Sequence, residues 1–312
     1  MQTAIYRNLG DNLIRRQATK ADANAIGDFI AKHHYDTLGV SMRDWMLQDT
    51  PLLSASDVVL VEDTTNGNIV SSAALFNRTW RYGDIEFGVG LSESVATEEV
   101  YRGRGLMRAV YNGLHQLSAA KGQLVQTVVG IPYFYRHFGY EYALDEHNTR
   151  TVHLSDVPTL REGESELFTI RPATLEDIST LAQLYERQCQ DRVVIMVRDE
   201  ATWRFLITDA SLGALTISLF CILDADGNTV GYFGTWGKRA GGYDMIREIA
   251  VVDGVSLHNV LPTVLRSIKA HVLQASANNP DWTPTKIFFS LGIDHAVYDV
   301  LGNKISPHRP SN

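Results

Sequence analysis

Residues 95–108 read VATEEVYRGRGLMR and join a strand-like stretch to the start of a helix. The residues before Glu98, from 85 to 97, alternate apolar with small side chains, which predicts a β-strand. From Met107 onward, apolar residues recur at the spacing of a helix face. The segment therefore predicts a strand, a glycine-containing loop and a helix in direct succession.

A loop of this kind can bind an anion. The unpaired amides of the loop and of the first helical turn point to one place, where the helix dipole adds positive potential. Two glycines allow close approach of the backbone to a ligand, and three arginines add positive charge: Arg102, Gly103, Arg104, Gly105 and Arg108. The pattern favours phosphate or pyrophosphate binding, with an exposed basic loop as the alternative. It is not a P-loop, which needs GxxxxGK followed by Ser or Thr. It is not the dinucleotide fingerprint GxGxxG either, because Arg108 stands at the third glycine position.

The chain also repeats itself. Residues 13–22 (LIRRQATKAD) and 168–177 (FTIRPATLED) share Arg, Ala, Thr and Asp at matching positions. In both segments a short strand precedes a Thr that can cap an apolar-periodic helix. The hairpin signals Asn66-Gly67 and Asp226-Gly227 recur in the same order. This repeat predicts two copies of one fold.

The length of 312 residues fits two domains of about 150 residues each. We place them at residues 1–160 and 161–312, with the polar stretch around 159–165 as the linker. The predicted fold class is α/β (α+β), and each domain is a mixed, mostly antiparallel sheet flanked by helices.

Composition excludes several classes of protein. With 45% hydrophobic and 21% charged residues, the chain is neither disordered nor a coiled coil. Its net charge of −8 argues against nucleic-acid binding, which needs basic side chains to neutralise phosphates. The two cysteines form no disulfide framework or metal motif, so we expect no metal. No apolar run reaches the roughly 20 residues of a membrane span, so we expect a cytoplasmic protein without membrane contact.

The run 95–108 resembles the acetyl-CoA-binding motif of the Gcn5-related N-acetyltransferases (GNAT). Arg102, Gly103, Arg104, Gly105 and Leu106 match the family pattern, whereas Met107 departs at its last position. A second segment, PYFYRHFGY at residues 132–140, is similar to the aromatic helix and turn that follow in this family. Both motifs stand in the family order. The resemblance covers residues 13–145.

This resemblance implies that acetyl-CoA is the acyl donor. The expected cofactor-binding residues lie on the strand end, on the loop with the first helical turn, and after the next strand: Val95, Ala96 and Thr97; Arg102, Gly103, Arg104, Gly105, Leu106, Met107 and Arg108; Gly130 and Ile131. The strand end would hold the pantetheine arm and face the thioester, and the loop would cradle the pyrophosphate.

Two residues are the expected catalytic groups. Tyr135 is the candidate general acid, since a phenol with a pKa of about 10 keeps a proton to give to a leaving thiolate; the alternative is one more packed aromatic ring. Glu93 is the candidate base on the strand that enters the site, with a solvated strand residue as the alternative. His33 and His34 are further candidates for the base.

The acceptor pocket is expected near two segments of the first half. They are residues 34–45 and 80–84, with Trp45, Trp80 and Tyr82 as candidate walls. Core packing explains the same aromatic residues equally well.

The tandem layout is similar to the enhanced-intracellular-survival (Eis) type of acetyltransferase. Proteins of that type carry a third, sterol-carrier-like domain, for which this chain leaves no room, so their C-terminal base is not transferred to it. In the second half, Asp253-Gly254-Val255-Ser256 replaces the arginine-glycine loop. We expect that half to keep the fold without binding pyrophosphate.

The predicted function is acetyl-CoA-dependent N-acetylation of a small-molecule or peptide amine, by direct attack in a ternary complex. The alternatives are a non-catalytic acyl-CoA-binding or assembly protein and a mycothiol-synthase-like tandem acetyltransferase. The expected partner is the amine alone, with no nucleic acid and no membrane; a homodimer is left open.

Overall fold

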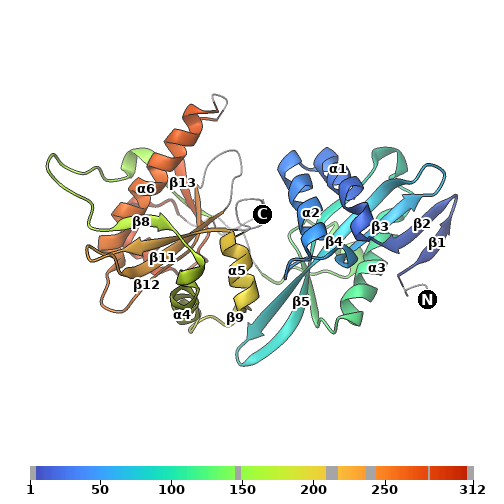
Figure 1. Cartoon of the computed structure of the whole chain (residues 1–312), viewed down its shortest axis with the longest axis horizontal. Helices are drawn as coiled ribbons and strands as arrows, with labels where there is room; N and C mark the ends of the chain where they lie inside the picture. The colour runs from blue at the N-terminus through green and yellow to red at the C-terminus, as the bar shows by residue number, and fades with distance from the viewer. Residues whose placement is uncertain (1–4, 145–148, 209–216, 237–243, 280–281, 308–312) are drawn as a thin grey trace. The chain divides into compact units, whose positions relative to one another are not determined.

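The computed structural model describes residues 5–144, 149–208, 217–236, 244–279 and 282–307. The chain forms two compact units (Figure 1). The first unit comprises Met1–Tyr142 and Arg192–Thr202, and the second comprises Ala143–Asp191 and Trp203–Asn312. No helix among these described residues is long and apolar enough to cross a membrane.

The first unit is built on a mixed sheet. Its described strands are β1 (Arg7–Gly10), β2 (Leu13–Gln17), β3 (Val58–Asp63), β4 (Asn68–Tyr82), β5 (Ile85–Thr97), β6 (Val125–Val128) and β9 (Val194–Val197). They follow the order β1-β2-β3-β4-β5-β6, and β9 pairs with the far end of β4. Neighbouring strands are antiparallel except β5 and β6, which are parallel.

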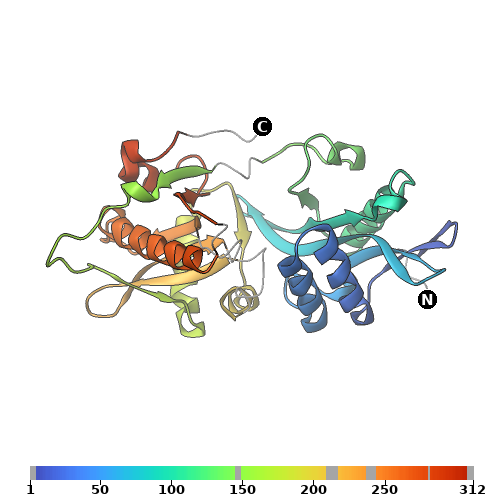
Figure 2. The ribbon, with the colours of Figure 1, turned by 90° about the horizontal axis from the view of Figure 1, so that it is seen from above.

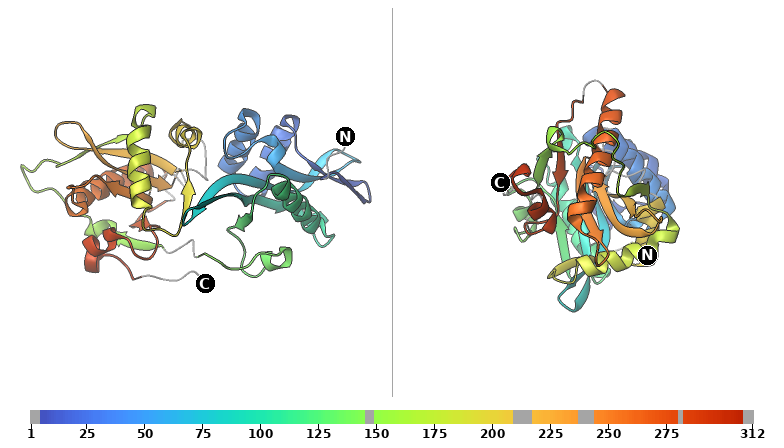
Figure 3. Two further views of the ribbon diagram at one scale, coloured as in Figure 1. Left: turned by 90° about the horizontal axis from the view of Figure 1, so that it is seen from below. Right: turned by 90° about the vertical axis from the view of Figure 1, so that its left-hand side faces the viewer.

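Helices cover both faces of this sheet. Helices α1 (Ala23–His33) and α2 (Asp36–Gln48) lie on one face and α3 (Leu106–Ala120) lies on the other (Figures 2 and 3). Successive strand residues point to opposite faces. Accordingly, Phe76 meets Trp45 of α2 edge to face at 5.7 Å between ring centroids, whereas Leu75 belongs to the core cluster beneath α3. Trp45 is 1% exposed, so it packs in the core.

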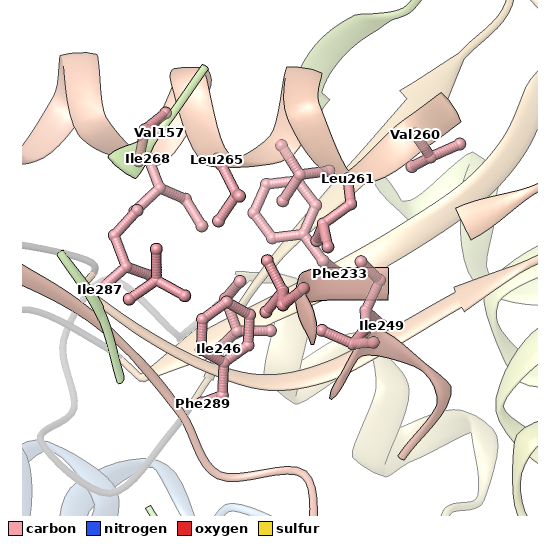
Figure 4. Close-up of a cluster of buried hydrophobic side chains, with 14 of the residues drawn as sticks. Val157, Phe233, Ile246, Ile249, Val260, Leu261, Leu265, Ile268, Ile287 and Phe289 are labelled. Carbon is pink, nitrogen blue, oxygen red and sulfur yellow. The ribbon is translucent and has the colours of Figure 1, made fainter. Parts of the chain in front are cut away.

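The second unit repeats this plan. Its strands are β7 (Arg150–His153), β8 (Thr169–Pro172), β10 (Ile217–Leu223), β11 (Thr229–Trp236), β12 (Met245–Val251) and β13 (Lys286–Phe289), in the order β7-β13-β12-β11-β10-β8. Here β12 and β13 form the parallel pair. The helices are α4 (Ile178–Gln188), α5 (Glu200–Thr208), α6 (Leu257–Ala277) and α7 (Ala296–Leu301). Figure 4 shows Leu261, Leu265 and Ile268 of α6 facing the strand residues Phe233 and Ile246.

The sequence repeat has a shared atomic basis. Arg16 donates two hydrogen bonds to Asp22, and Arg171 does the same to Asp177. In both units a threonine caps the short 3-10 turn (η1, Lys20–Asp22; η6, Leu175–Asp177) that leads into the first helix of the repeat. The two hairpins are antiparallel, as their turn residues predict. Two mixed, mostly antiparallel sheets flanked by helices confirm the predicted fold class.

The division between the units differs from the expected boundary after residue 160. The chain passes from one unit to the other between Tyr142 and Ala143, because β7 pairs with β13 and so joins the second sheet. Residues 159–165 lie inside the second unit and contain no helix or strand. In the opposite direction, β9 comes from the second half of the sequence but pairs with β4.

Candidate active site

The glycine loop ends at the N-terminus of α3. A short 3-10 turn (η3, Glu99–Tyr101) follows β5, and then Gly103 and Gly105 adopt φ values of 74° and 76°. Such positive values are costly for residues with a Cβ. Gly105 is the N-cap residue of α3, and no side chain caps the helix there. The first amides of α3 are therefore open to an external acceptor such as a phosphate group.

The three predicted arginines surround this helix end and are exposed. Arg102 donates to the carbonyl oxygen of Thr97 at 3.4 Å, and Arg108 donates to that of His137 at 3.0 Å. Arg104 lies over the Tyr101 ring at 5.3 Å. These contacts orient the guanidinium groups while leaving donors available for a ligand.

Strands β5 and β6 part next to this loop. Their parallel pairing ends at Ser92 and Val128, so the last part of β5 pairs with β4 alone. A bulge marks the change, because the β4–β5 register shifts after Glu93 and Ser94 adopts a φ of +54°. Strained backbone of this kind is frequent at functional sites. Beyond the bulge, backbone groups of residues 95–97 are free of pairing with β6.

The structure brings the two expected catalytic residues, Tyr135 and Glu93, within electrostatic reach of each other. Tyr135 lies in the 3-10 turn η4 (Tyr135–Phe138) after β6. Burial raises the pKa of Tyr135, a hydrogen bond from Tyr111 lowers it, and the negative charge of Glu93 raises it. Glu93 itself lies half-buried at the bulge of β5. The charge of Glu93, at the bulge where β5 and β6 part, therefore acts on the phenol of Tyr135.

Tyr135 packs beside a buried pair of hydroxyl groups. Ser92 of β5 and Tyr111 of α3 lie 2.9 Å apart, oxygen to oxygen, and the Tyr111 ring meets the Tyr135 ring edge to face at 5.8 Å between centroids. Tyr111 is fully buried, and burial raises its pKa well above the usual range. A buried tyrosine needs a partner for its hydroxyl group, and Ser92 provides that partner for Tyr111.

Gly130 allows Tyr135 to take this position. A Cβ atom at residue 130 would lie 2.1 Å from the Tyr135 ring, so a larger residue requires that ring to move. The neighbouring Ile131 is 67% exposed, and Leu106 of the predicted loop is buried in the core. Leu106 can therefore contribute only backbone groups to a ligand.

Both histidines that were candidates for the base contact the end of β5. Nε2 of His34 lies 3.2 Å from the carbonyl oxygen of Val95, and burial lowers the pKa of His34. Nε2 of His33 lies 3.3 Å from the carboxylate of Glu98 and its ring packs on Phe29 at 4.6 Å. His34 is therefore the histidine nearer the unpaired part of β5.

A cavity of about 150 Å³ lies at the edge of β4. It is lined by Pro51, Leu52, Asn77, Arg78, Thr79, Met196, Val197, Asp199 and Thr202. The cavity occupies the interval in which β4 has left β3, whose pairing ends at Ala74, and has not yet met β9. Neither Arg78 nor the β9 residues were anticipated. An arginine that follows the apolar run Ala73–Phe76 of β4 was the available signal for Arg78, whereas no local pattern indicates that β9 joins this sheet.

The corresponding helix start in the second unit is closed. Gly254 has a φ of 82° three residues before α6, as Gly103 has three residues before α3. The side chain of Ser256 then accepts a hydrogen bond from the backbone N–H of His258. Arg187 pairs with Asp253 at 2.5 Å. Among the described residues, no group of three or more side chains suited to a metal ion occurs in either unit.

Comparisons with known proteins show what the first unit and the fold are similar to. The model of the acetyltransferase (GNAT) domain matches residues 16–143, and a search of curated proteins found no match. Solved structures with a similar fold include GCN5-related N-acetyltransferases from Kribbella flavida (16% identity, TM-score 0.60) and Anabaena variabilis (14%, 0.60). A probable N-acyltransferase from Enterococcus faecalis is also similar (13%, 0.58). The matches cover 94%, 94% and 89% of this chain and 68%, 70% and 65% of those proteins.

Proposed function

We propose, from the match of residues 16–143 to the acetyltransferase (GNAT) domain, that the chain transfers an acetyl group from acetyl-CoA to a primary amine. The acceptor is an amine of a small molecule or peptide, which attacks directly while both substrates are bound. The observation that supports this most is the uncapped start of α3, preceded by two left-handed glycines, beside the place where β5 and β6 part.

The residues present fit acetyl-CoA. The open amides at the start of α3, with Arg102, Arg104 and Arg108 around them, suit a pyrophosphate group. On its side away from β4, the part of β5 that is not paired with β6, residues 95–97, offers backbone groups to the amide groups of a pantetheine arm. Acetyl-CoA supplies the acetyl thioester, and this chain supplies its orientation.

Glu93 is the proposed base. An ammonium group cannot attack a carbonyl carbon until it has lost a proton, and a carboxylate at the bulge can accept that proton directly or through a water molecule. Backbone N–H groups beyond the bulge are fixed donors for negative charge that develops on the acetyl oxygen. Fixed donors need no reorganisation during the reaction, which is why they stabilise such charge efficiently.

Tyr135 is the proposed acid, and Tyr111 is a positioning residue. The Tyr111 ring, held by its hydroxyl contact with Ser92, packs edge to face on Tyr135 and so orients the phenol whose proton goes to the leaving thiolate. The raised pKa of Tyr135 keeps the phenol protonated at neutral pH.

The test is release of free CoA from acetyl-CoA with a panel of amines. Replacing Tyr135 by Phe is expected to lower kcat by ~100-fold or more, the usual contribution of a general acid, with little change in the KM for acetyl-CoA. Tyr133→Phe is the matched control, because Tyr133 is 71% exposed and adjoins the same turn. Tyr111→Phe is expected to lower kcat less and to move the alkaline limb of the pH profile upward, since it removes the bond that lowers the pKa of Tyr135.

Two outcomes would contradict the proposal. Full turnover in Tyr135→Phe would remove the acid role. Binding of acetyl-CoA without acetylation of any amine would instead favour a non-catalytic acyl-CoA-binding protein.

A further inference from the structure

The cavity beside β4 is lined by a cation, Arg78, that forms no ion pair with any residue that the structure describes. Among the described residues, the guanidinium group of Arg78 makes no hydrogen bond or ion pair, although the charges of Glu93 and Arg198 act on it. Arg78 lines the cavity and is half-buried on β4. An arginine that is partly withdrawn from water normally has an anionic or hydrogen-bonded partner, because desolvation of an unpaired charge is unfavourable.

The electrostatic surroundings of Arg78 favour the arrival of an anion. The pKa of Arg78 falls to about 10, because burial and the positive charge of Arg198 both oppose its protonated form, while Glu93 supports it only in part. The group remains charged at neutral pH. An incoming carboxylate would restore the stabilisation that burial removes, and the planar fork of a guanidinium matches a carboxylate in geometry.

The acidic residue of the cavity is engaged elsewhere. The carboxylate of Asp199 accepts a hydrogen bond from the backbone N–H of Thr202 at 2.8 Å, in the first turn of α5. An acidic side chain in that place satisfies a free amide and interacts favourably with the helix dipole.

The position of Arg78 relative to Glu93 connects the cavity with the proposed chemistry. Their strands are neighbours, Glu93 lies opposite Ala74 and Arg78 lies opposite Val89, so the two residues share the face covered by α1 and α2. Glu93 acts electrostatically on Arg78 as well as on Tyr135. A cavity of about 150 Å³ has room for a carboxylate with a short carbon chain, but not for a large acceptor.

We propose that Arg78 and the cavity beside β4 form an acceptor subsite that binds a carboxylate, so that the acceptor is an amine that also carries a carboxylate group. The inference rests on the proposed function. The amine of such an acceptor lies at Glu93 while its carboxylate pairs with Arg78. This arrangement selects amino acids or short peptides over amines without an anionic group.

The experiment compares acceptors that differ only in this charge. β-Alanine, 4-aminobutyrate and glycylglycine are each paired with their carboxamide, and kcat/KM is measured with saturating acetyl-CoA. The acid is expected to exceed its amide by about tenfold or more for at least one chain length, as for one desolvated charge-assisted contact. Arg78→Gln is expected to remove that ratio mainly through KM, and Arg78→Lys is expected to restore part of it.

The matched control is Arg7→Gln, which removes the same charge from the exposed edge strand β1 of the same unit. It is expected to leave the ratio unchanged. Equal rates for acids and amides in the unaltered protein would overturn the subsite, as would an equal loss for both in Arg78→Gln. If the proposed function itself fails, no amine of either kind is acetylated, which is a different result. In that case the subsite is tested by binding: the acids, and not the amides, must raise the Tm of the unaltered protein, and they must not raise that of Arg78→Gln.

Discussion

The starts of α3 and α6 occupy the same place in two copies of one fold and have opposite chemistry. Gly103 and Gly254 match in position and in conformation. Beside them, Arg102 corresponds to Asp253, and the N-cap Gly105 corresponds to Ser256. Ser256 satisfies an amide of α6 with its own hydroxyl group, whereas the amides of α3 have no side-chain cap. A shared backbone therefore leaves one helix end open to a ligand and closes the other.

The largest expected effect comes from introducing the same backbone strain into the loops before α3 and α6, which tests whether only the first binds acetyl-CoA. Gly103→Val and Gly254→Val each force a β-branched residue into a left-handed conformation, at a similar cost to folding. A Cβ atom meets no neighbour within 4 Å at either position, so packing does not distinguish the two changes. We expect Gly103→Val to weaken acetyl-CoA binding by ~100-fold or more, measured by calorimetry.

The second-unit variant is the internal control. Gly254→Val is expected to leave acetyl-CoA affinity within about threefold, because that loop has no role in the proposed site and an affinity change below 1 kcal/mol is small. A comparable loss of affinity in both variants would contradict the assignment of the cofactor to the first unit.

A smaller effect is expected behind the site, at Gly130. Gly130→Ala must displace the Tyr135 ring, because the added Cβ would lie 2.1 Å from it. We expect kcat to fall by about tenfold or more, since a small displacement of a general acid is costly. The measurement is a double-mutant cycle with Tyr135→Phe. If the alanine acts only through Tyr135, the double variant is no slower than Tyr135→Phe alone; additive losses would show a separate role for residue 130.

The smallest expected effect concerns the arginine–aspartate pair that both units contain, Arg16–Asp22 and Arg171–Asp177. The pKa of Asp177 is lowered, chiefly by a hydrogen bond from Arg171. Burial raises the pKa of Asp22, but hydrogen bonds from Arg16 and Thr19 outweigh burial, so the pKa of Asp22 is lowered as well. A depressed folded-state pKa gives stability that is present above the unfolded value near 4 and is lost as pH falls through the folded one.

We expect Asp22→Asn and Asp177→Asn each to lower the free energy of unfolding at pH 7 by about 1–2 kcal/mol, and less at pH 3. Thermal unfolding of both variants at the two pH values provides the measurement. A loss that stays the same at pH 3 would show that charge is not the cause.

Local patterns in the sequence were sufficient to predict the repeated features. The Arg–Thr–Asp caps, the hairpin turns, the strand Ile85–Thr97 and the loop before α3 all depend on residues close to one another along the chain. Pairing between strands that are distant in the sequence was harder to predict from local patterns. The expected boundary after residue 160 differs from the division after Tyr142, because β7 pairs with β13 and β9 pairs with β4. Both are edge strands of four residues, too short for their sequence to indicate a partner. Trp45 belongs to the core because α2 packs it on Phe76.

The sequence by itself determined the two-copy fold and the open loop at residues 102–108, because these follow from short-range spacing and side-chain chemistry, and its resemblance to a family supplied the candidates Glu93 and Tyr135. Only the tertiary structure decided which groups act together. The bulge at Ser94, the Ser92–Tyr111 hydroxyl pair and the cavity at Arg78 arise from strands and helices that are distant in sequence. Hydrogen-bond direction and desolvation depend on those distant neighbours, so they are fixed only when the sheet is complete.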